Sequence, residues 1–133
     1  MDTPLLQRLG LLAVAGALGT LARLGVYSLV GSMGLGRLPV ATMVVNVLGC
    51  LAFGLVWALA EQQGRIPEGV RWLLLTGFIG AFTTFSTFAF ETVHLMSQGR
   101  PLAAAANILL SNVLGIGAFF VGWWAAGLMS RGV

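Results

Sequence analysis

The stretch of sequence that decides the fold is Thr76-Gly-Phe-Ile-Gly-Ala-Phe-Thr-Thr-Phe-Ser-Thr-Phe88. It lies inside an apolar run, yet it holds two glycines followed by four hydroxyl residues within five positions. A glycine inside a helix costs about 1 kcal/mol relative to alanine. Serine and threonine hydroxyls compete with the helix for backbone hydrogen bonds. These residues predict a helix that is broken between Gly80 and Thr84.

The composition around this stretch indicates a membrane protein. The chain has 133 residues, of which 58% are hydrophobic and 8% are charged, with 19 glycines. A typical soluble domain is about 25% charged, and a chain this short has too little interior to bury so much apolar surface. The composition therefore excludes a soluble globular protein. We expect a single transmembrane domain over residues 1–133, since ~20 apolar residues per crossing leave no room for another domain.

Four apolar runs, separated by short connectors, predict an all-α membrane protein with four transmembrane helices. The predicted spans are about residues 9–30, 40–60, 70–96 and 102–129. The first run, which follows Arg8, also has features of a cleavable signal peptide, with a small-residue step at Ala13 and Ala15. We interpret it as a span because the apolar run resumes after Arg23.

The arginines give only a weak preference for one orientation in the membrane. An even number of spans places both termini and the middle connector on one side, and arginines in short flanks favour the cytoplasm. The side with the termini and the middle connector carries four arginines, Arg8, Arg65, Arg71 and Arg131. The opposite side carries Arg37 and Arg100, so the count slightly favours cytoplasmic termini. This small difference is compatible with insertion in both orientations and antiparallel pairing. Because four helices form a thin bundle, a path for a solute needs a second copy, and we expect a homodimer.

The first span carries one charged residue, Arg23, and an arginine near a helix centre costs about 2.5–3.5 kcal/mol to insert. It shares a stripe with Gly16, Gly19 and Tyr27, which are spaced three or four residues apart. Arg23 either extends to the nearer membrane interface or faces a wet vestibule, where its permanent charge would attract anions. The sequence leaves both interpretations open.

The second and fourth spans each carry two polar residues one helical turn apart, Thr42 with Asn46 and Asn107 with Ser111. An asparagine deep in an apolar run needs a hydrogen-bond partner. These pairs either join helices to one another or line a polar path. The glycines of the fourth span predict close backbone approach, and they are Gly115, Gly117 and Gly122.

The predicted break and the residues after it form a candidate ion site. Non-helical backbone inside a membrane survives only where it is buried in protein or lines a cavity, and its free carbonyls can coordinate a cation. Phe85 and Phe88 place neighbouring rings on one helix face, beside a stripe of Thr84, Thr87 and Glu91. Such rings are commonly core or lipid contacts, but their positive edges can stabilise a small anion. Weak binding of this kind suits conduction, which requires release.

No set of residues in the sequence is typical of an enzyme. His94 and Cys50 are solitary, Glu91 is the one acid inside a span, and there is no lysine for a phosphate-binding loop. A nucleophile with a base and an orienting acid cannot be assembled from these residues. The arginines are scattered rather than clustered, so we expect no nucleic-acid partner.

Three motifs point to a known family. They are the run from Gly77 to Phe88 with Glu91, Asn46 within Val-Asn-Val-Leu-Gly, and Arg23 at the end of Gly-Thr-Leu-Ala-Arg. With these motifs the chain resembles the microbial fluoride-channel family, the Fluc or CrcB proteins, across all four spans. The resemblance implies two identical chains that insert antiparallel and enclose two narrow fluoride pores. It places the protein in the plasma membrane of a prokaryote, which is the inner membrane if the cell is Gram-negative.

The resemblance also implies roles for individual residues. Phe85 and Phe88 would turn their ring edges toward fluoride, and Arg23 would stand at the vestibule. The residues implied to line the pore are Thr42, Asn46, Thr84, Thr87, Glu91, Asn107 and Ser111. The backbone carbonyls of Gly80 and Thr83 from both chains would hold a structural Na+ on the two-fold axis, and this ion is not transported.

Two positions depart from the family pattern. Asn107 stands where many relatives carry a tyrosine, and Gly115 stands where they carry a hydroxyl residue. These departures imply a shorter or differently hydrated polar track on the fourth span.

The main alternative is a small multidrug-type proton-coupled transporter, which is also a four-span dimer. Such a protein needs a membrane-embedded carboxylate early in the chain, whereas here the first span holds Arg23 and only Glu91 is available. A non-transporting membrane subunit that binds a partner through its glycine faces is a third interpretation. It leaves the clustered hydroxyls of the third span unexplained.

Overall fold

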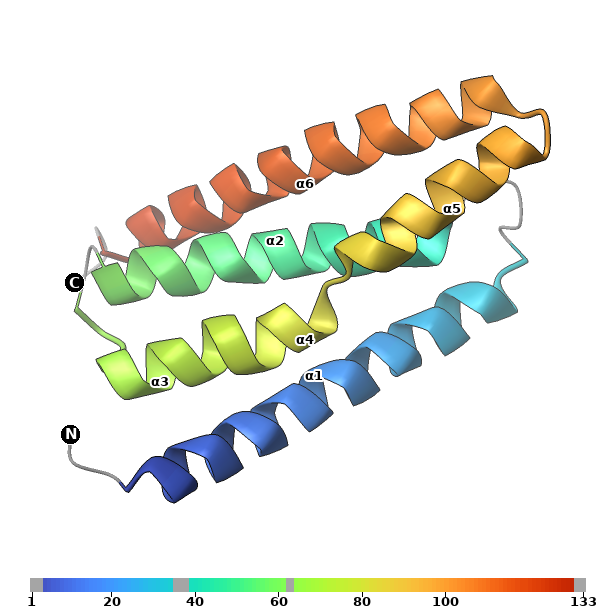
Figure 1. Cartoon of the computed structure of the whole chain (residues 1–133). Coiled ribbons are helices and arrows are strands. Elements are labelled where there is room, and N and C mark those ends of the chain that lie inside the picture. Colours follow the sequence, from blue (N-terminus) through green and yellow to red (C-terminus); the bar gives the residue numbers. More distant parts are fainter. Residues whose placement is uncertain (1–3, 35–38, 62–63, 131–133) are drawn as a thin grey trace.

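Three of the four long segments are continuous helices, and the third is interrupted (Figure 1). The computed structural model describes residues 4–34, 39–61 and 64–130. The continuous helices are α1 (Leu5–Ser32), α2 (Val40–Glu61) and α6 (Pro101–Ser130). The third segment consists of α3 (Glu68–Trp72), the π-helical η1 (Leu73–Ile79), α4 (Gly80–Phe82) and α5 (Phe85–Ser97). The predicted break is therefore confirmed, and it lies at residues 83 and 84.

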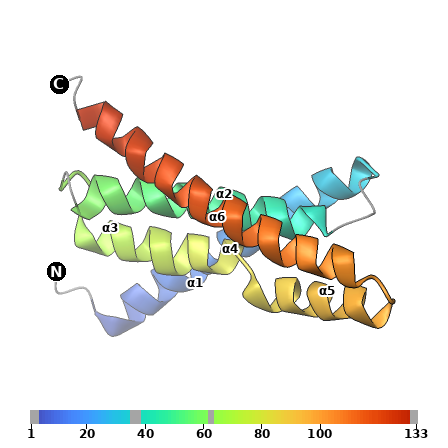
Figure 2. The ribbon, with the colours of Figure 1, turned by 90° about the horizontal axis from the view of Figure 1, so that it is seen from above.

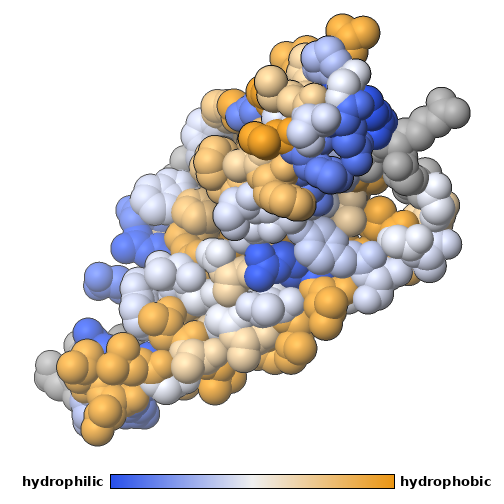
Figure 3. Space-filling view, turned by 45° about the vertical axis from the view of Figure 1, so that its right-hand side comes forward, coloured by the Kyte–Doolittle hydropathy of each residue, from blue (hydrophilic) through white to orange (hydrophobic). Residues whose placement is uncertain are grey.

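Four segments of the described chain are long and apolar enough to cross a membrane, and they are Leu5–Ser32, Val40–Glu61, Glu68–Ser97 and Pro101–Met129. They confirm the four predicted spans to within a few residues. Large hydrophobic side chains stay on the outside, where Leu6 is 82% and Leu102 is 86% exposed. Figure 3 shows apolar residues spread over much of one face of the molecule. An exterior of this kind suits contact with lipid.

The start of α1, the start of α3 and the end of α6 lie at one end of the bundle, which we call the terminal end (Figure 1). The α5–α6 connector lies at the opposite end. Of the arginines in the orientation argument, Arg8 lies at the start of α1, Arg65 between α2 and α3, and Arg71 in α3, all at the terminal end. Arg100 lies in the α5–α6 connector at the opposite end. Arg37 and Arg131 lie outside the described residues.

The helices approach most closely where glycines replace side chains. A Cβ at Gly54 would overlap the carbonyl oxygen of Phe119, and a Cβ at Gly122 would overlap that of Leu51. The backbones of α2 and α6 are therefore in direct contact. A Cβ at Gly19 would overlap the Phe78 carbonyl in the same way, which holds α1 against η1. Small residues allow this close packing between membrane helices.

Only part of the glycine prediction for the fourth span is confirmed. Gly122 makes the expected close approach, and a Cβ at Gly115 would stand 3.5 Å from the Cys50 sulfur, which is an ordinary contact. The prediction for Gly117 is wrong, because nothing lies within 4 Å of its Cβ position. At about 100° per residue, Gly115 and Gly122 share one face of α6 and Gly117 points the opposite way.

Two matched substitutions on α6 test this packing. We expect Gly122→Ala to lower the stability of the folded protein by about 1–3 kcal/mol, because the new methyl group meets backbone atoms that cannot move aside. Gly117→Ala should leave it unchanged or raise it by up to about 1 kcal/mol, through the better helix propensity of alanine. Thermal unfolding in detergent measures both. Equal effects at the two positions would contradict the backbone contact between α2 and α6.

Candidate functional site

The break consists of two extended residues between α4 and α5. Thr83 has φ −78° and ψ 158°, and Thr84 has φ −150° and ψ 113°. Gly80, in contrast, is helical with φ −61° and ψ −37°. The interruption therefore begins at the hydroxyl residues, three positions after the glycine. Because the chain steps sideways here, α5 is displaced from the line of α3 and α4 (Figure 2).

The side chain of Asn46 on α2 pairs with both backbone groups of Thr84. The Thr84 N–H donates to Asn46 Oδ1 at 2.9 Å, and Asn46 Nδ2 donates to the Thr84 carbonyl at 3.1 Å. A membrane interior offers no water for these groups, so an unpaired N–H or C=O would be costly. Asn46 thus replaces the partner that the Thr84 N–H loses at the break. It also gives a second donor to the Thr84 carbonyl, which as the N-cap accepts the first hydrogen bond of α5.

The clustered hydroxyls begin the next helix. Thr84 is the N-cap of α5, and its Oγ1 accepts a hydrogen bond from the Thr87 N–H at 3.2 Å. The same hydroxyl donates to Thr87 Oγ1 at 3.0 Å and lies 3.3 Å from Ser86 Oγ. The Thr83 hydroxyl turns back and donates to the Ile79 carbonyl at 3.0 Å. The hydroxyls that weaken a continuous helix therefore stabilise its restart.

The break also frees a backbone carbonyl. In a continuous helix the Thr84 N–H would bond to the carbonyl of Gly80, but here it bonds to Asn46. A groove of about 300 Å³ opens beside the break. Its lining residues are Asn46, Gly49, Cys50, Phe53, Ile79, Gly80, Thr83, Thr84, Phe85 and Phe119. The predicted cation residues, Gly80 and Thr83, thus share one groove with Asn46 and Phe85.

Phe85 and Phe88 form a ring pair at the start of α5. Their centroids are 5.6 Å apart and the ring planes are inclined by 45°. Phe85 is 79% exposed, whereas Phe88 is partly buried. The predicted proximity of the rings is confirmed. The pair lies beside the groove rather than inside an enclosed passage of the single chain.

On α6, Asn107 turns toward α5 and is only 1% exposed. Its Nδ2 donates to Thr92 Oγ1 at 2.9 Å, and the Thr92 hydroxyl donates to the Phe88 carbonyl at 2.8 Å. Ser111 Oγ lies 3.4 Å from Asn107 Oδ1, where it donates a long hydrogen bond. Asn107 therefore joins α6 to the turn of α5 that carries Phe88. Sequence reasoning did not single out Thr92, although its hydroxyl follows Phe88 by one helical turn inside an apolar run.

On α2, Thr42 lies between residues of two other helices. The Tyr27 hydroxyl on α1 is 3.0 Å from Thr42 Oγ1, and Thr42 Oγ1 donates to Glu91 Oε1 on α5 at 2.8 Å. Thr42 is 2% exposed. The sequence placed Tyr27 on a stripe with Arg23 but did not predict its contact with Thr42. Arg23 is partly buried, and within the described chain it makes no ion pair or hydrogen bond.

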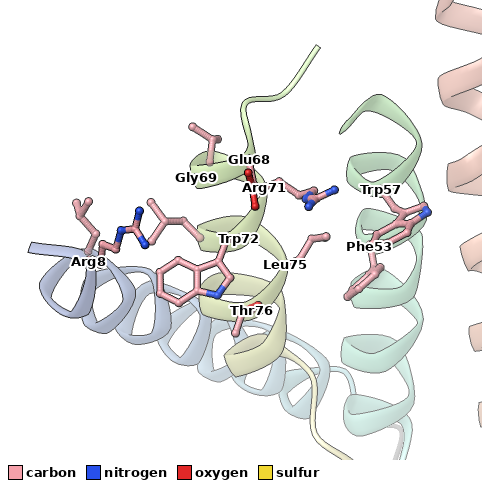
Figure 4. Close-up of a pocket in the computed structure, with 12 residues that line it drawn as sticks. Arg8, Phe53, Trp57, Glu68, Gly69, Arg71, Trp72, Leu75 and Thr76 are labelled. Carbon is pink, nitrogen blue, oxygen red and sulfur yellow. The ribbon is translucent and has the colours of Figure 1, made fainter. Parts of the chain in front are cut away.

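A larger groove, of about 730 Å³, lies at the terminal end between α1, α3, η1 and α2 (Figure 4). Arg71 points toward Trp57 on α2, with its guanidinium carbon 5.8 Å from the ring centroid, and it forms an ion pair with Glu61. Arg8 lies on the α1 side of the groove. Among the described residues, no group of three or more His, Cys, Asp or Glu side chains could hold a metal ion. The groove thus lacks the ligands of a side-chain metal centre.

Comparison with known proteins gives the family. A family model described as "CrcB-like protein, Camphor Resistance (CrcB)" matches residues 10–123. The chain belongs to the CrcB family. The CrcB match covers the break, the ring pair and every polar contact described above.

Bacterial relatives of this CrcB chain carry a functional name, "Fluoride-specific ion channel FluC". The relative from Nitratidesulfovibrio vulgaris is 48% identical over 117 residues, which are 88% of this chain and 94% of the relative. The relative from Solidesulfovibrio magneticus is 49% identical over 119 residues, or 89% and 94% of the two chains. The relative from Nitrosococcus oceani is 45% identical over 117 residues, or 88% and 94%.

The pairing between Asn46 and Thr84 predicts the effect of removing the amide. We expect Asn46→Ala to lower stability by about 1–3 kcal/mol, because the Thr84 N–H loses its partner. The Thr84 carbonyl loses the donor on Asn46 but still accepts the first hydrogen bond of α5. Asn112→Ala is the matched control, since that amide is exposed and donates only to a carbonyl of its own helix. Thermal unfolding compares the two variants, and equal stability would contradict the role of Asn46.

Proposed function

We propose that this chain forms a fluoride-selective passive channel that lets cytoplasmic fluoride leave the cell. The supporting observation is the ring pair of Phe85 and Phe88 beside a hydrogen-bonded break, in a CrcB chain whose relatives are named fluoride-specific ion channels. The protein then acts by conduction and performs no chemical reaction. With a negative cell interior, the membrane potential supplies about 2.3 kcal/mol per charge per 100 mV for export.

The chemistry of the break suits a small anion. Fluoride is strongly hydrated, so a narrow path must replace its water with hydrogen-bond donors and positive ring edges. A hydroxyl has one hydrogen to donate, and a carboxamide has two. Thr87 accepts from Thr84 and donates to no described residue, and Asn46 uses one of its two N–H groups. These two residues keep donors for fluoride beside Phe85 and Phe88.

The other polar residues support the path indirectly. The single hydrogen of Thr42 is donated to Glu91, and Asn107 donates to Thr92. We assign Thr42, Glu91, Asn107 and Ser111 to the wall of the pore and Arg23 to its vestibule, where a permanent positive charge raises the local concentration of anions. Thr84 holds the start of α5 through its cap on Thr87.

A second, inverted copy would close the path. Phe85 is 79% exposed, and Gly80 is exposed beside an open groove, so one chain leaves the ring pair uncovered. The four tryptophans are Trp57, Trp72, Trp123 and Trp124. They fall near the end of α2, in α3 and in the last third of α6, which are the parts of these helices at the terminal end. Tryptophan is enriched at both membrane interfaces. Two antiparallel chains would place tryptophans at both membrane interfaces, and this supports an antiparallel homodimer of dual topology. Its place is the plasma membrane, which is the inner membrane if the cell is Gram-negative.

A structural Na+ fits between two such copies. The Gly80 carbonyl lacks its helical partner, and Thr83 is the first extended residue after α4. Backbone carbonyls at a broken membrane helix are suitable ligands for Na+. We propose that Gly80 and Thr83 of both chains hold the ion through these oxygens and that it is not transported.

The ring pair gives the first functional test. Purified wild-type protein in liposomes should pass fluoride electrically and exclude chloride, and Phe85→Ile or Phe88→Ile should reduce fluoride flux by about tenfold, since aromatic contacts contribute about 0.5–1.5 kcal/mol. Phe90→Ile, on the same helix and 67% exposed, is the matched control. Unchanged flux in both ring variants would remove the ring-edge argument. Proton-dependent exchange of cations would favour the multidrug-type transporter instead.

Removal of Na+ gives the second test. Replacing Na+ by N-methylglucamine should lower both fluoride flux and dimer stability, and Na+ should restore both. When the Na+ concentration is about a hundred times the Kd of the site, binding adds about 2.7 kcal/mol to the stability of the folded protein. Flux and unfolding temperature that are independent of Na+ would contradict the proposed ion site.

A further inference from the structure

The protein has one tyrosine, Tyr27, and its side chain belongs to a series of hydrogen bonds that connects three helices. Tyr27 Oη on α1 lies 3.0 Å from Thr42 Oγ1 on α2, and Thr42 Oγ1 lies 2.8 Å from Glu91 Oε1 on α5. Thr42, in the middle, is 2% exposed. Water therefore has little access to the two hydrogen bonds that Thr42 makes.

Because each hydroxyl has one hydrogen, the donor and the acceptor of both hydrogen bonds can be assigned. The Thr42 hydroxyl has one hydrogen and donates it to Glu91. In the contact with Tyr27, Thr42 can then only accept, so the Tyr27 hydroxyl is the donor. Both hydrogens point toward the carboxyl group, and the Tyr27 donation strengthens the Thr42 hydroxyl as a donor.

The carboxyl group of Glu91 needs this support. Glu61 and Glu68 lie at helix ends, whereas Glu91 lies inside α5. Its second oxygen, Oε2, is buried and has no hydrogen-bond partner in the described part of the chain. Among the described residues, the hydrogen bond from Thr42 is therefore the one bond that fixes the position of the Glu91 carboxyl group.

A freed Glu91 would compete with fluoride for a donor. Glu91 follows Thr87 by four residues on α5, and side chains at this spacing are neighbours on a helix. Thr87 has a hydroxyl hydrogen that no described residue accepts. A Glu91 carboxyl group that turned away from Thr42 could accept this hydrogen through a carboxyl oxygen, and the Thr87 donor would then be lost to an anion at the rings.

We infer that Tyr27 is a positioning residue for ion conduction, which acts through Thr42 to hold the Glu91 carboxyl away from the Thr87 hydroxyl. This role rests on the proposed fluoride conduction. It adds α1 to the helices that shape the path. It also explains why the Tyr27 hydroxyl lies beside the buried Thr42.

The test compares fluoride flux in proteoliposomes. Tyr27→Phe should reduce fluoride flux about threefold to tenfold, which is the change expected for the loss of one net hydrogen bond. The fraction of dimer and the exclusion of chloride should stay unchanged. Ser28→Ala is the matched control, because that hydroxyl donates only to Leu24 of its own helix. Because Tyr27 acts through Thr42, Tyr27→Phe/Thr42→Val should conduct no less than Thr42→Val alone. Wild-type flux in Tyr27→Phe, or additive losses in the double variant, would overturn the inference.

A second measurement does not depend on conduction. Because the chain has a single tyrosine, its ultraviolet resonance Raman signal reports the hydrogen bonding of Tyr27 alone. We expect a donating phenol in the wild type, a changed signal in Thr42→Val and an unchanged signal in Ser28→Ala. An unchanged signal in Thr42→Val would overturn the inference even if that variant does not conduct. A wild-type protein that passes no fluoride would instead overturn the proposed function.

Discussion

The structure depends on one constraint, that backbone polar groups in hydrocarbon must be paired. The third span breaks at Thr83 and Thr84, and the Asn46 amide on α2 meets both backbone groups of Thr84. This pairing allows α5 to start on a displaced axis without unpaired groups at that residue. The position of the Phe85 and Phe88 rings follows from that start. A polar side chain on one helix thus determines where another helix begins.

Close packing brings Asn46 within reach of the break. A Cβ at Gly49, one turn after Asn46, would overlap the Thr83 side chain, so the absence of that atom lets the extended residues lie against α2. On the other side, Gly19 of α1 lies against the Phe78 carbonyl of η1. The third span is therefore held between two helices, against α2 through the Thr83 side chain at Gly49 and against α1 through the Phe78 backbone at Gly19. Glycine serves here through its lack of a side chain, since the φ of Gly80 is an ordinary helical one.

The hydrogens of the polar side chains are few, and most are used within the protein. Thr42 gives its hydrogen to Glu91, Asn107 donates to Thr92, and Thr84 donates to Thr87. The first two of these bonds join helices, and the third links two hydroxyls at the start of α5, so the polar residues first stabilise the bundle. The donors that remain on Thr87 and Asn46 lie beside the break, among others in the described chain such as the second N–H of Asn107. A site with few free donors can hold a small anion briefly and release it, as conduction requires.

The sequence by itself determined the four spans, the interrupted third helix and the residues around the break, because apolar length and local propensity are properties of short segments. It also placed Phe85 next to Phe88, since helical spacing fixes neighbours on one helix. It did not determine that Asn46 pairs with Thr84, that Asn107 reaches Thr92, or that Tyr27 reaches Thr42. It wrongly placed Gly117 in a helix contact. Partners on different helices depend on how those helices rotate and slide against one another, and only the tertiary structure decides this.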